Sequence, residues 1–195
     1  LDASGVAHGQ TVQWTWDGSE YEMAQLDAFV FSTIAQEFVR GYTDFPPWLF
    51  EQLPVGVNHL EIEPTDGVTD HCNAWSDGQG INFLTAGPLG YGGYQCNNTA
   101  MIADILYHEF GHGVHIQGAY QTIGSFDEAT SEAFADTCAV SITHDPVVGR
   151  YFITEGFGIR DLEPDLVWPE DATGEVHDDG QVLGSTLWDL REALI

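Results

Sequence analysis

The sequence predicts an α+β fold, with one helix and several strands in the N-terminal half and mainly helices after residue 97. Between residues 22 and 40, apolar side chains recur mostly at three- and four-residue steps, which is the period of a helix. Residues 55–62 alternate between apolar and polar as a strand does, and residues 80–85 form a second strand candidate. Two further helical patterns follow residue 98.

We expect a short strand at Val12–Trp16 and the end of the first helical region at Pro46–Pro47. Residues 66–79 are expected to be a loop, and residues 87–98 a glycine-rich connection. No internal repeat or Pro/Ser-rich linker is visible. A chain of 195 residues can bury one sizeable core. We therefore expect a single domain over residues 1–195, with an α+β lobe in residues 1–97 and the site-bearing helices in residues 98–195.

The charge balance is strongly acidic. The chain has 31 Asp and Glu residues against four basic residues, all arginine, for a formal net charge of −27. This charge argues against binding to nucleic acid or to an anionic membrane through a broad basic surface. It suits a secreted protein, a high-salt habitat or carboxylates that bind Ca²⁺, and a merely soluble acidic surface explains it equally well.

The sequence lacks an apolar stretch of the ~20 residues that a membrane-spanning helix needs. Its first residues have neither the basic start nor the apolar run of a signal peptide. The sequence stops within a predicted helix that covers Leu183–Ile195. We expect it to be a piece of a longer precursor or assembly, with its C-terminal helical lobe truncated.

The three cysteines fall into two groups. Cys72 and Cys96 lie in loop-like sequence on either side of a predicted strand, so a disulfide between them would close a loop of roughly 25 residues. Zinc binding by these two residues is the weaker alternative, because neither belongs to a C-x-x-C pair. Cys138 lies on the apolar side of a predicted helix and is expected to be a buried free thiol. A disulfide would place the protein in an extracellular or periplasmic setting.

The segment Tyr107–Gly113 reads YHEFGHG and contains the H-E-x-x-H pattern. Residues four apart lie on the same face of a helix, so His108 and His112 can bind one Zn²⁺ while Glu109 serves as general base. Asn98 or Thr99 can cap this helix, and Gly118 is a natural end. Gly111 and Gly113 are poor helix formers, which indicates that a backbone or a metal comes close to the helix there.

A two-histidine zinc site needs a third protein ligand. Ser125-x-x-Glu128 is a capping-box pattern at the start of a second helix, on which Glu128, Glu132 and Asp136 form one acidic stripe. Such a stripe is often only a solvated helix face. His115 is the competing candidate, but it lies about 10.5 Å along the helix axis from His108. A carboxylate from a second helix that crosses the first can therefore reach the metal more readily than His115 can.

The segment Ser131–Asp136 reads SEAFAD, and its glutamate falls twenty positions after His112. This H-E-x-x-H … E-x-x-x-D arrangement resembles the gluzincin metallopeptidases of the thermolysin type. The resemblance implies that Glu132 is the third zinc ligand and that Asp136 accepts a hydrogen bond from His108 and orients it. Glu128 remains a possible substitute for Glu132, because it too has a carboxylate four residues further on.

A second stretch, Glu175–Gly180 followed by Leu187–Leu190, is similar to the H-x-x-G … L-W-D-L region of fungalysin-type enzymes. The resemblance implies that His177 stabilises the oxyanion of the reaction, whereas the plain alternative is an exposed loop histidine. A role for Tyr120 and an acidic partner for His177 are not assigned. The acidic residues of the last third could hold Ca²⁺ but follow no EF-hand spacing, so solvated carboxylates are favoured: Asp161, Glu163, Asp165, Asp171, Asp178 and Asp179.

Together these resemblances imply a thermolysin-like zincin fold, with an edge strand over the cleft formed by residues 72–75 followed by residues 80–83. An ordinary sheet strand is the alternative for that segment. The implied function is a zinc-dependent endopeptidase acting on peptide or protein substrates, because no G-x-M-E-N-like segment marks an aminopeptidase. The alternative is a catalytically idle metal-binding or structural module of a larger extracellular assembly.

Overall fold

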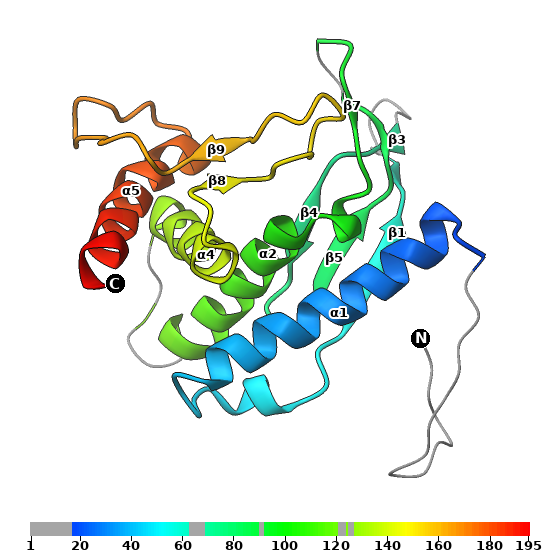
Figure 1. The fold of residues 1–195 in the computed structure, drawn as a ribbon, viewed down its shortest axis with the longest axis horizontal. Coiled ribbons are helices and arrows are strands. Elements are labelled where there is room, and N and C mark those ends of the chain that lie inside the picture. The colour runs from blue at the N-terminus through cyan, green and yellow to red at the C-terminus, as the bar shows by residue number, and fades with distance from the viewer. Residues whose placement is uncertain (1–16, 63–68, 90–91, 121–123, 125–126) are drawn as a thin grey trace.

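A small sheet and four α-helices form the framework of the described part of the chain (Figure 1). The structure is a computed structural model, and it describes residues 17–62, 69–89, 92–120, 124 and 127–195. Its mixture of helices and strands confirms the predicted α+β class. The predicted strand at Val12–Trp16 and the predicted cap at Ser125 lie outside the described residues.

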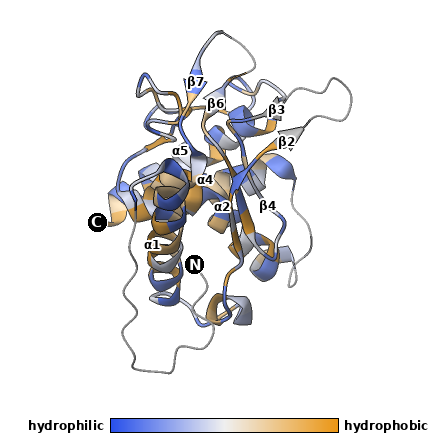
Figure 2. Cartoon of the chain, turned by 90° about the vertical axis from the view of Figure 1, so that its right-hand side faces the viewer, coloured by the Kyte–Doolittle hydropathy of each residue, from blue (hydrophilic) through white to orange (hydrophobic). Residues whose placement is uncertain are grey.

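Helix α1 covers Glu20–Arg40 and confirms the predicted helix of the N-terminal half. It begins where the Ser19 side chain accepts a hydrogen bond from the Glu22 backbone N–H. Its buried face is a stripe of small residues: Ala24, Ala28, Ser32 and Ala35. The larger residues Phe29 and Ile34, which carry much of the periodic pattern, are 58% and 43% exposed. Figure 2 shows polar and apolar residues alternating along this helix.

The main sheet has the strand order β1-β5-β4 and consists of β1 (Val55–His59), β5 (Ile81–Leu84) and β4 (Ala74–Ser76). Strands β1 and β5 are parallel, with Val55 opposite Ile81, and β4 and β5 are antiparallel, with Trp75 opposite Asn82. Strand β4 is therefore an edge of this sheet. The predicted second strand is confirmed as β5.

The predicted strand over residues 55–62 is in fact two strands in two sheets. Strand β1 ends at His59, and β2 (Glu61–Ile62) pairs instead with β3 (Thr69–Asp70). The prediction of an unbroken loop over residues 66–79 is wrong for β3 and β4, which are too short to show a periodic pattern. Two further short pairs complete the strands: β6 (Gly87–Pro88) with β7 (Gln95–Cys96), and β8 (Val147–Val148) with β9 (Arg160–Asp161).

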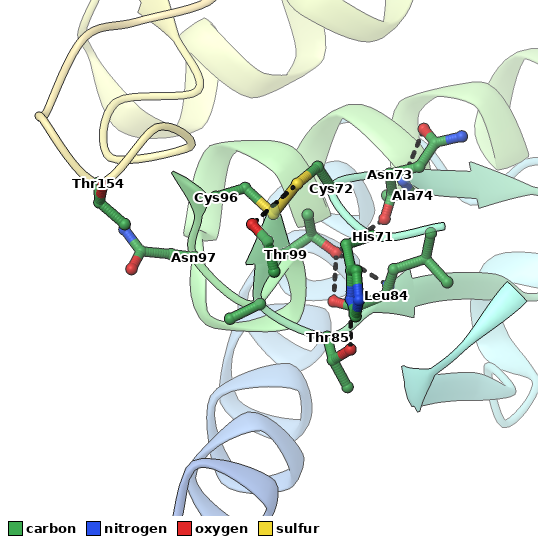
Figure 3. Close-up of a disulfide and its surroundings, with 12 residues drawn as sticks. His71, Cys72, Asn73, Ala74, Leu84, Thr85, Cys96, Asn97, Thr99 and Thr154 are labelled. Atoms are coloured by element: carbon green, nitrogen blue, oxygen red, sulfur yellow. Dashed lines mark hydrogen bonds between the residues drawn. A yellow bond between two sulfur atoms is a disulfide. The ribbon is translucent and has the colours of Figure 1, made fainter. Parts of the chain in front are cut away.

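The predicted disulfide is present. Cys72, two residues before β4, is bonded to Cys96 at the end of β7 (Figure 3). Next to it, the buried Thr99 hydroxyl accepts from the Leu84 N–H and lies within donating distance of the Asn73 and Leu84 carbonyl oxygens, which ties the start of the helical region to β4 and β5. Cys138 is a free thiol, as predicted, and burial raises its pKa to about 12.

Three helices carry the C-terminal half: α2 (Ala103–His115), α4 (Glu128–Thr143) and α5 (Val176–Leu194). Asn98 caps a separate 3-10 turn, η2 (Thr99–Met101), which precedes α2. Gly118 does not end the helix as predicted, because the chain continues as a π-helical turn, η3 (Ile116–Tyr120). Helix α4 is capped by Asp127, which accepts from the Thr130 N–H. Across the described residues, no helix combines the length and apolar character that crossing a membrane needs.

Helix α2 lies between α1 and the sheet on one side and α4 on the other, and α5 packs on the far side of α4 (Figure 1). A Cβ atom at Gly111 would lie 2.8 Å from the Ala135 Cα, and one at Gly113 would lie 2.7 Å from the Trp48 ring. Gly111 is therefore a point of close backbone approach, as predicted, whereas the neighbour at Gly113 is a side chain. The main core joins α1, α2 and the sheet, and a second apolar cluster lies between α4 and α5: Val140, Val148, Leu162 and Trp188.

Candidate metal centre

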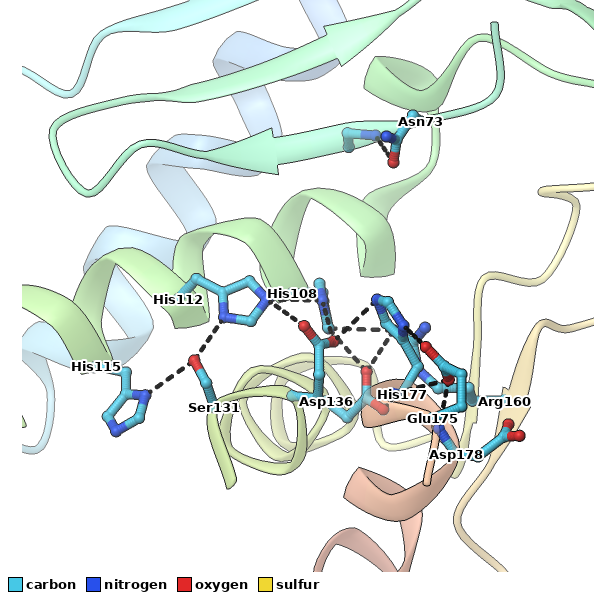
Figure 4. A network of polar contacts seen from close by, with 12 residues as sticks. Asn73, His108, His112, His115, Ser131, Asp136, Arg160, Glu175, His177 and Asp178 are labelled. Atoms are coloured by element: carbon cyan, nitrogen blue, oxygen red, sulfur yellow. Dashed lines mark hydrogen bonds and ion pairs between the residues drawn. The ribbon is translucent and has the colours of Figure 1, made fainter. Parts of the chain in front are cut away.

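Three side chains from two helices converge on one point. His108 and His112 lie one turn apart on α2 (Figure 4). Glu132, on α4, contacts both of them. The two Nε2 atoms are 3.1 Å apart, and each lies 3.3 Å from a Glu132 carboxylate oxygen. Among the described residues, these three side chains form the one group of His, Cys, Asp or Glu whose ligand atoms lie close enough together to hold a metal ion.

The spacing of these atoms fits a metal ion. Metal–ligand bonds of about 2.0–2.2 Å in a tetrahedral zinc site put neighbouring ligand atoms roughly 3.3–3.6 Å apart, close to the separations observed here. The Glu132 Oε2 atom is buried and has no hydrogen bond within the described structure. A bound cation would satisfy this oxygen and the two facing ring nitrogens together.

A buried carboxylate fixes the orientation of His108. The His108 ring donates from Nδ1 to Asp136 Oδ1 over 2.7 Å, and Asp136 is 0% exposed. Arg160 donates to both Asp136 oxygens, from Nε over 2.6 Å and from Nη2 over 2.7 Å. Because Nδ1 carries the proton, Nε2 of the neutral ring offers its lone pair to a metal.

The charges around the centre favour a cation. Burial alone would lower the pKa of His108, but the Asp136 and Glu132 carboxylates raise it to about 9. Burial alone would likewise raise the pKa of Glu132, yet its contacts with the two histidines hold that pKa well below the ordinary range. The Asp136 pKa is also lowered, because Arg160 and His108 outweigh the effect of burial. The site thus stabilises positive charge at the point where the three ligand atoms meet.

Glu109 lies beside the centre, at the wall of a cleft of about 580 Å³. It is 6% exposed, and burial raises the pKa of its carboxyl group. The cleft is bounded by the metal-site side chains on one side and by residues 72–76, including β4, on the other. Figure 4 shows this strand above α2. An edge strand, β4, therefore borders the cleft, whereas residues 81–83, which were expected to belong to the edge segment, lie in the central strand β5.

His177 lies in the first turn of α5 at the same cleft, and its side chain is 50% exposed. Its Nε2 atom is 3.7 Å from Glu132 Oε2, and its Nδ1 donates to Glu175 Oε1 over 2.8 Å. Gly180 makes this arrangement possible, because a Cβ atom there would lie 2.8 Å from the Glu132 Cβ. His177 is therefore a helix residue at the site and not a distant loop histidine.

The other candidates lie outside the group of three. Glu128 is exposed at the start of α4, so the geometry favours Glu132 as the third ligand. The His115 ring bonds to Ser131, and the Tyr120 ring packs against His115, 4.8 Å away between centroids. Within the described residues, the acidic side chains of the last third form no second group that could hold a metal: Asp161, Glu163, Asp165, Asp171, Asp178 and Asp179.

Three residues that contribute to the site were not predicted from the sequence: Arg160, Ser131 and Glu175. Ser131 Oγ lies 3.0 Å from His112 Nδ1. Arg160 is 24 residues from Asp136, and no local pattern connects the two. The role of Glu175 could have been predicted, because an acidic residue two positions before a histidine can cap the same helix and bond to the histidine ring.

Comparisons with known proteins identify no relative: no model of a protein family matches the sequence, and no curated protein matches it significantly.

Proposed function

We propose that the chain is the catalytic domain of a zinc-dependent endopeptidase with a thermolysin-like fold. The observation that carries the proposal is the position of Glu109. A buried carboxylate stands at the cleft wall next to a His-His-Glu group, with an edge strand opposite. Two imidazoles and one carboxylate suit Zn²⁺, which in catalytic sites takes three protein ligands and keeps one position open.

When bound, zinc would supply a Lewis acid for the carbonyl oxygen of the substrate and would acidify water. Glu109 takes the proton from the attacking water and delivers it to the leaving amine. Burial supports this role because it raises the Glu109 pKa above its ordinary value, which makes the carboxylate a stronger base.

His177 faces the same centre and donates to the oxyanion that develops on the carbonyl. Because its Nδ1–H bonds to Glu175, Nε2 can donate only when the ring carries both protons. Glu175 then has the task of holding the charged ring in place. Among the described residues, no strand pairs with the side of β4 that faces away from β5, so its backbone groups can bind an extended peptide, and we expect a preference for unfolded or loop-like substrates.

The proposal is tested by metal analysis followed by cleavage of a casein-type substrate. We expect about one zinc per chain, cleavage that stops with a chelator, and recovery when zinc is added. Cleavage that persists in a zinc-free preparation would contradict the proposal. Zinc binding without cleavage of casein or of a broad peptide library would instead favour the idle metal-binding module.

A further inference from the structure

His115 is a buried histidine that the proposed reaction does not use. It lies three residues beyond His112 on α2 and is 3% exposed. Its Nδ1 atom is 3.1 Å from Ser131 Oγ, and the same oxygen is 3.0 Å from His112 Nδ1 (Figure 4). One hydroxyl on α4 therefore connects a proposed metal ligand to a second histidine.

The His115 ring is held in this orientation by two aromatic side chains. Phe134 stacks on it with centroids 5.1 Å apart and an interplanar angle of 26°. Tyr120 meets it edge-on, with centroids 4.8 Å apart. The ring cannot turn without losing both contacts, so its Nδ1 atom is directed at Ser131.

A bound metal would fix the direction of the first hydrogen bond in this series of contacts. His112 Nε2 can bind a metal only if the ring proton is on Nδ1, so His112 donates to Ser131 Oγ. A hydroxyl has one proton to donate, and the described structure gives Ser131 Oγ two partners, the two histidines. That proton is then available to His115 Nδ1, which accepts it when the His115 ring proton lies on Nε2.

We propose that His115 is a positioning residue for the metal centre, which acts through Ser131 to fix the metal-binding tautomer and the orientation of His112. The inference rests on the proposed metal site but not on peptidase activity. When His115 Nδ1 is present as the acceptor, the O–H bond of Ser131 points toward His115. Without it, the same hydroxyl is free to donate to His112 Nδ1, which favours the tautomer that cannot bind a metal.

The first test is the histidine tautomer in the zinc-loaded protein, measured by long-range ¹H–¹⁵N correlation at a pH where the rings are neutral. We expect the ring proton of His112 on Nδ1 and that of His115 on Nε2. A His115 ring protonated on Nδ1 in the zinc-loaded protein would overturn the inference.

The second test is zinc affinity, measured by competition with a chelator. His115→Phe keeps the aromatic packing but removes the acceptor, and we expect about tenfold weaker binding. His115→Asn offers a carbonyl oxygen in place of Nδ1 and should bind zinc nearly as tightly as the unchanged protein. Ser131→Ala should weaken binding about 10- to 100-fold, whereas Ser141→Ala, the same change elsewhere on α4, should have no effect.

The outcomes separate the two proposals. If the unchanged protein binds zinc and folded His115→Phe binds it equally well, His115 has only a packing role and the inference fails alone. If the unchanged protein binds no zinc, both proposals fail. If zinc binds with the expected pattern but no peptide is cleaved, the inference stands and the peptidase proposal fails.

Discussion

Asp136 connects the metal centre to the rest of the protein through one carboxylate. It accepts from His108 on one side and from the Arg160 guanidinium on the other, with 0% exposure. A buried ion pair contributes little net stability, but removal of one partner leaves the other charge buried and unpaired. Asp136 therefore orients a proposed ligand and compensates the charge of Arg160 at the same time.

Asp136→Asn tests both roles. We expect zinc affinity to fall about 10- to 100-fold, because the neutral amide holds the His108 proton less well. We also expect the free energy of unfolding to fall by about 3–5 kcal/mol, since Arg160 loses its counterion. The measurements are chelator competition and urea unfolding. Asp189→Asn, an exposed change on α5, is the matched control and should leave both quantities unchanged.

The pH dependence of zinc binding follows from His108. Its pKa in the metal-free protein is raised to about 9 from an ordinary value of 6.5, so zinc must displace a proton below that pH. We expect the affinity to rise by about tenfold per pH unit toward pH 9 and to level off above it. In the metal-free protein, the protonated ring contributes stability that is fully present below pH 6.5 and is lost as the pH rises through about 9. An affinity that does not change between pH 7 and 9 would contradict this assignment.

At the scale of elements, α4 is the support on which the other parts of the site meet. Helix α2 approaches it where Gly111 faces Ala135, and α5 approaches it where Gly180 faces Glu132. These contacts bring His108, His112 and His177 toward one carboxylate. The positions of the glycines, more than helix propensity, set the distance between the helices.

Gly180→Ala should push α5 away from α4. The added Cβ would lie 2.8 Å from the Glu132 Cβ and 3.0 Å from the Ala129 carbonyl oxygen, neither of which can move freely. We expect a loss of about 1–2 kcal/mol in urea unfolding, since overpacking outweighs the gain in helix propensity. Gly184→Ala, one turn further, meets only the side chain of Leu162, whose Cδ2 would lie 2.9 Å away, and should cost less, because a side-chain methyl group can shift more easily than backbone. Equal effects of the two changes would refute this account of the contact.

The sequence predicted those parts of the fold that have a long period or a dense motif. Helix α1, strand β5 and the helix with His108 and His112 are of this kind. The buried face of α1 was not predictable from hydrophobicity, because small residues pack there while Phe29 and Ile34 stay exposed. Strand β4 has three residues and hence no period. Arg160 could not be found either, since its partner is distant in the chain.

At the scale of the whole molecule, the disulfide joins the edge of the cleft to the segment that leads into α2. Cys72 lines the cleft just before β4, and Cys96 lies three residues before Thr99. The bond therefore holds β4 near the helices that carry the metal centre. Ion pairs with the acidic surface do not hold β4 in the same way. Each of the four arginines is paired with an acidic residue elsewhere in the structure: Arg40, Arg150, Arg160 and Arg191.

Replacing both Cys72 and Cys96 by serine should lower the free energy of unfolding by about 3 kcal/mol, as expected for a closed loop with a sequence separation of 24. Denaturant unfolding of the variant and of the unchanged protein measures this. Cys138→Ser is the control for loss of a thiol that forms no disulfide. A double variant as stable as the unchanged protein would show that the loop is held by other contacts.

The central claim is that Glu109 moves the proton in a zinc-dependent hydrolysis. The most direct measurement compares zinc content and peptide cleavage rate in Glu109→Gln and in the unchanged protein. We predict that the variant keeps about one zinc per chain, because Glu109 is not among the three ligand side chains, and loses at least about 100-fold in cleavage rate. A variant with full zinc content and an unchanged cleavage rate would contradict the claim.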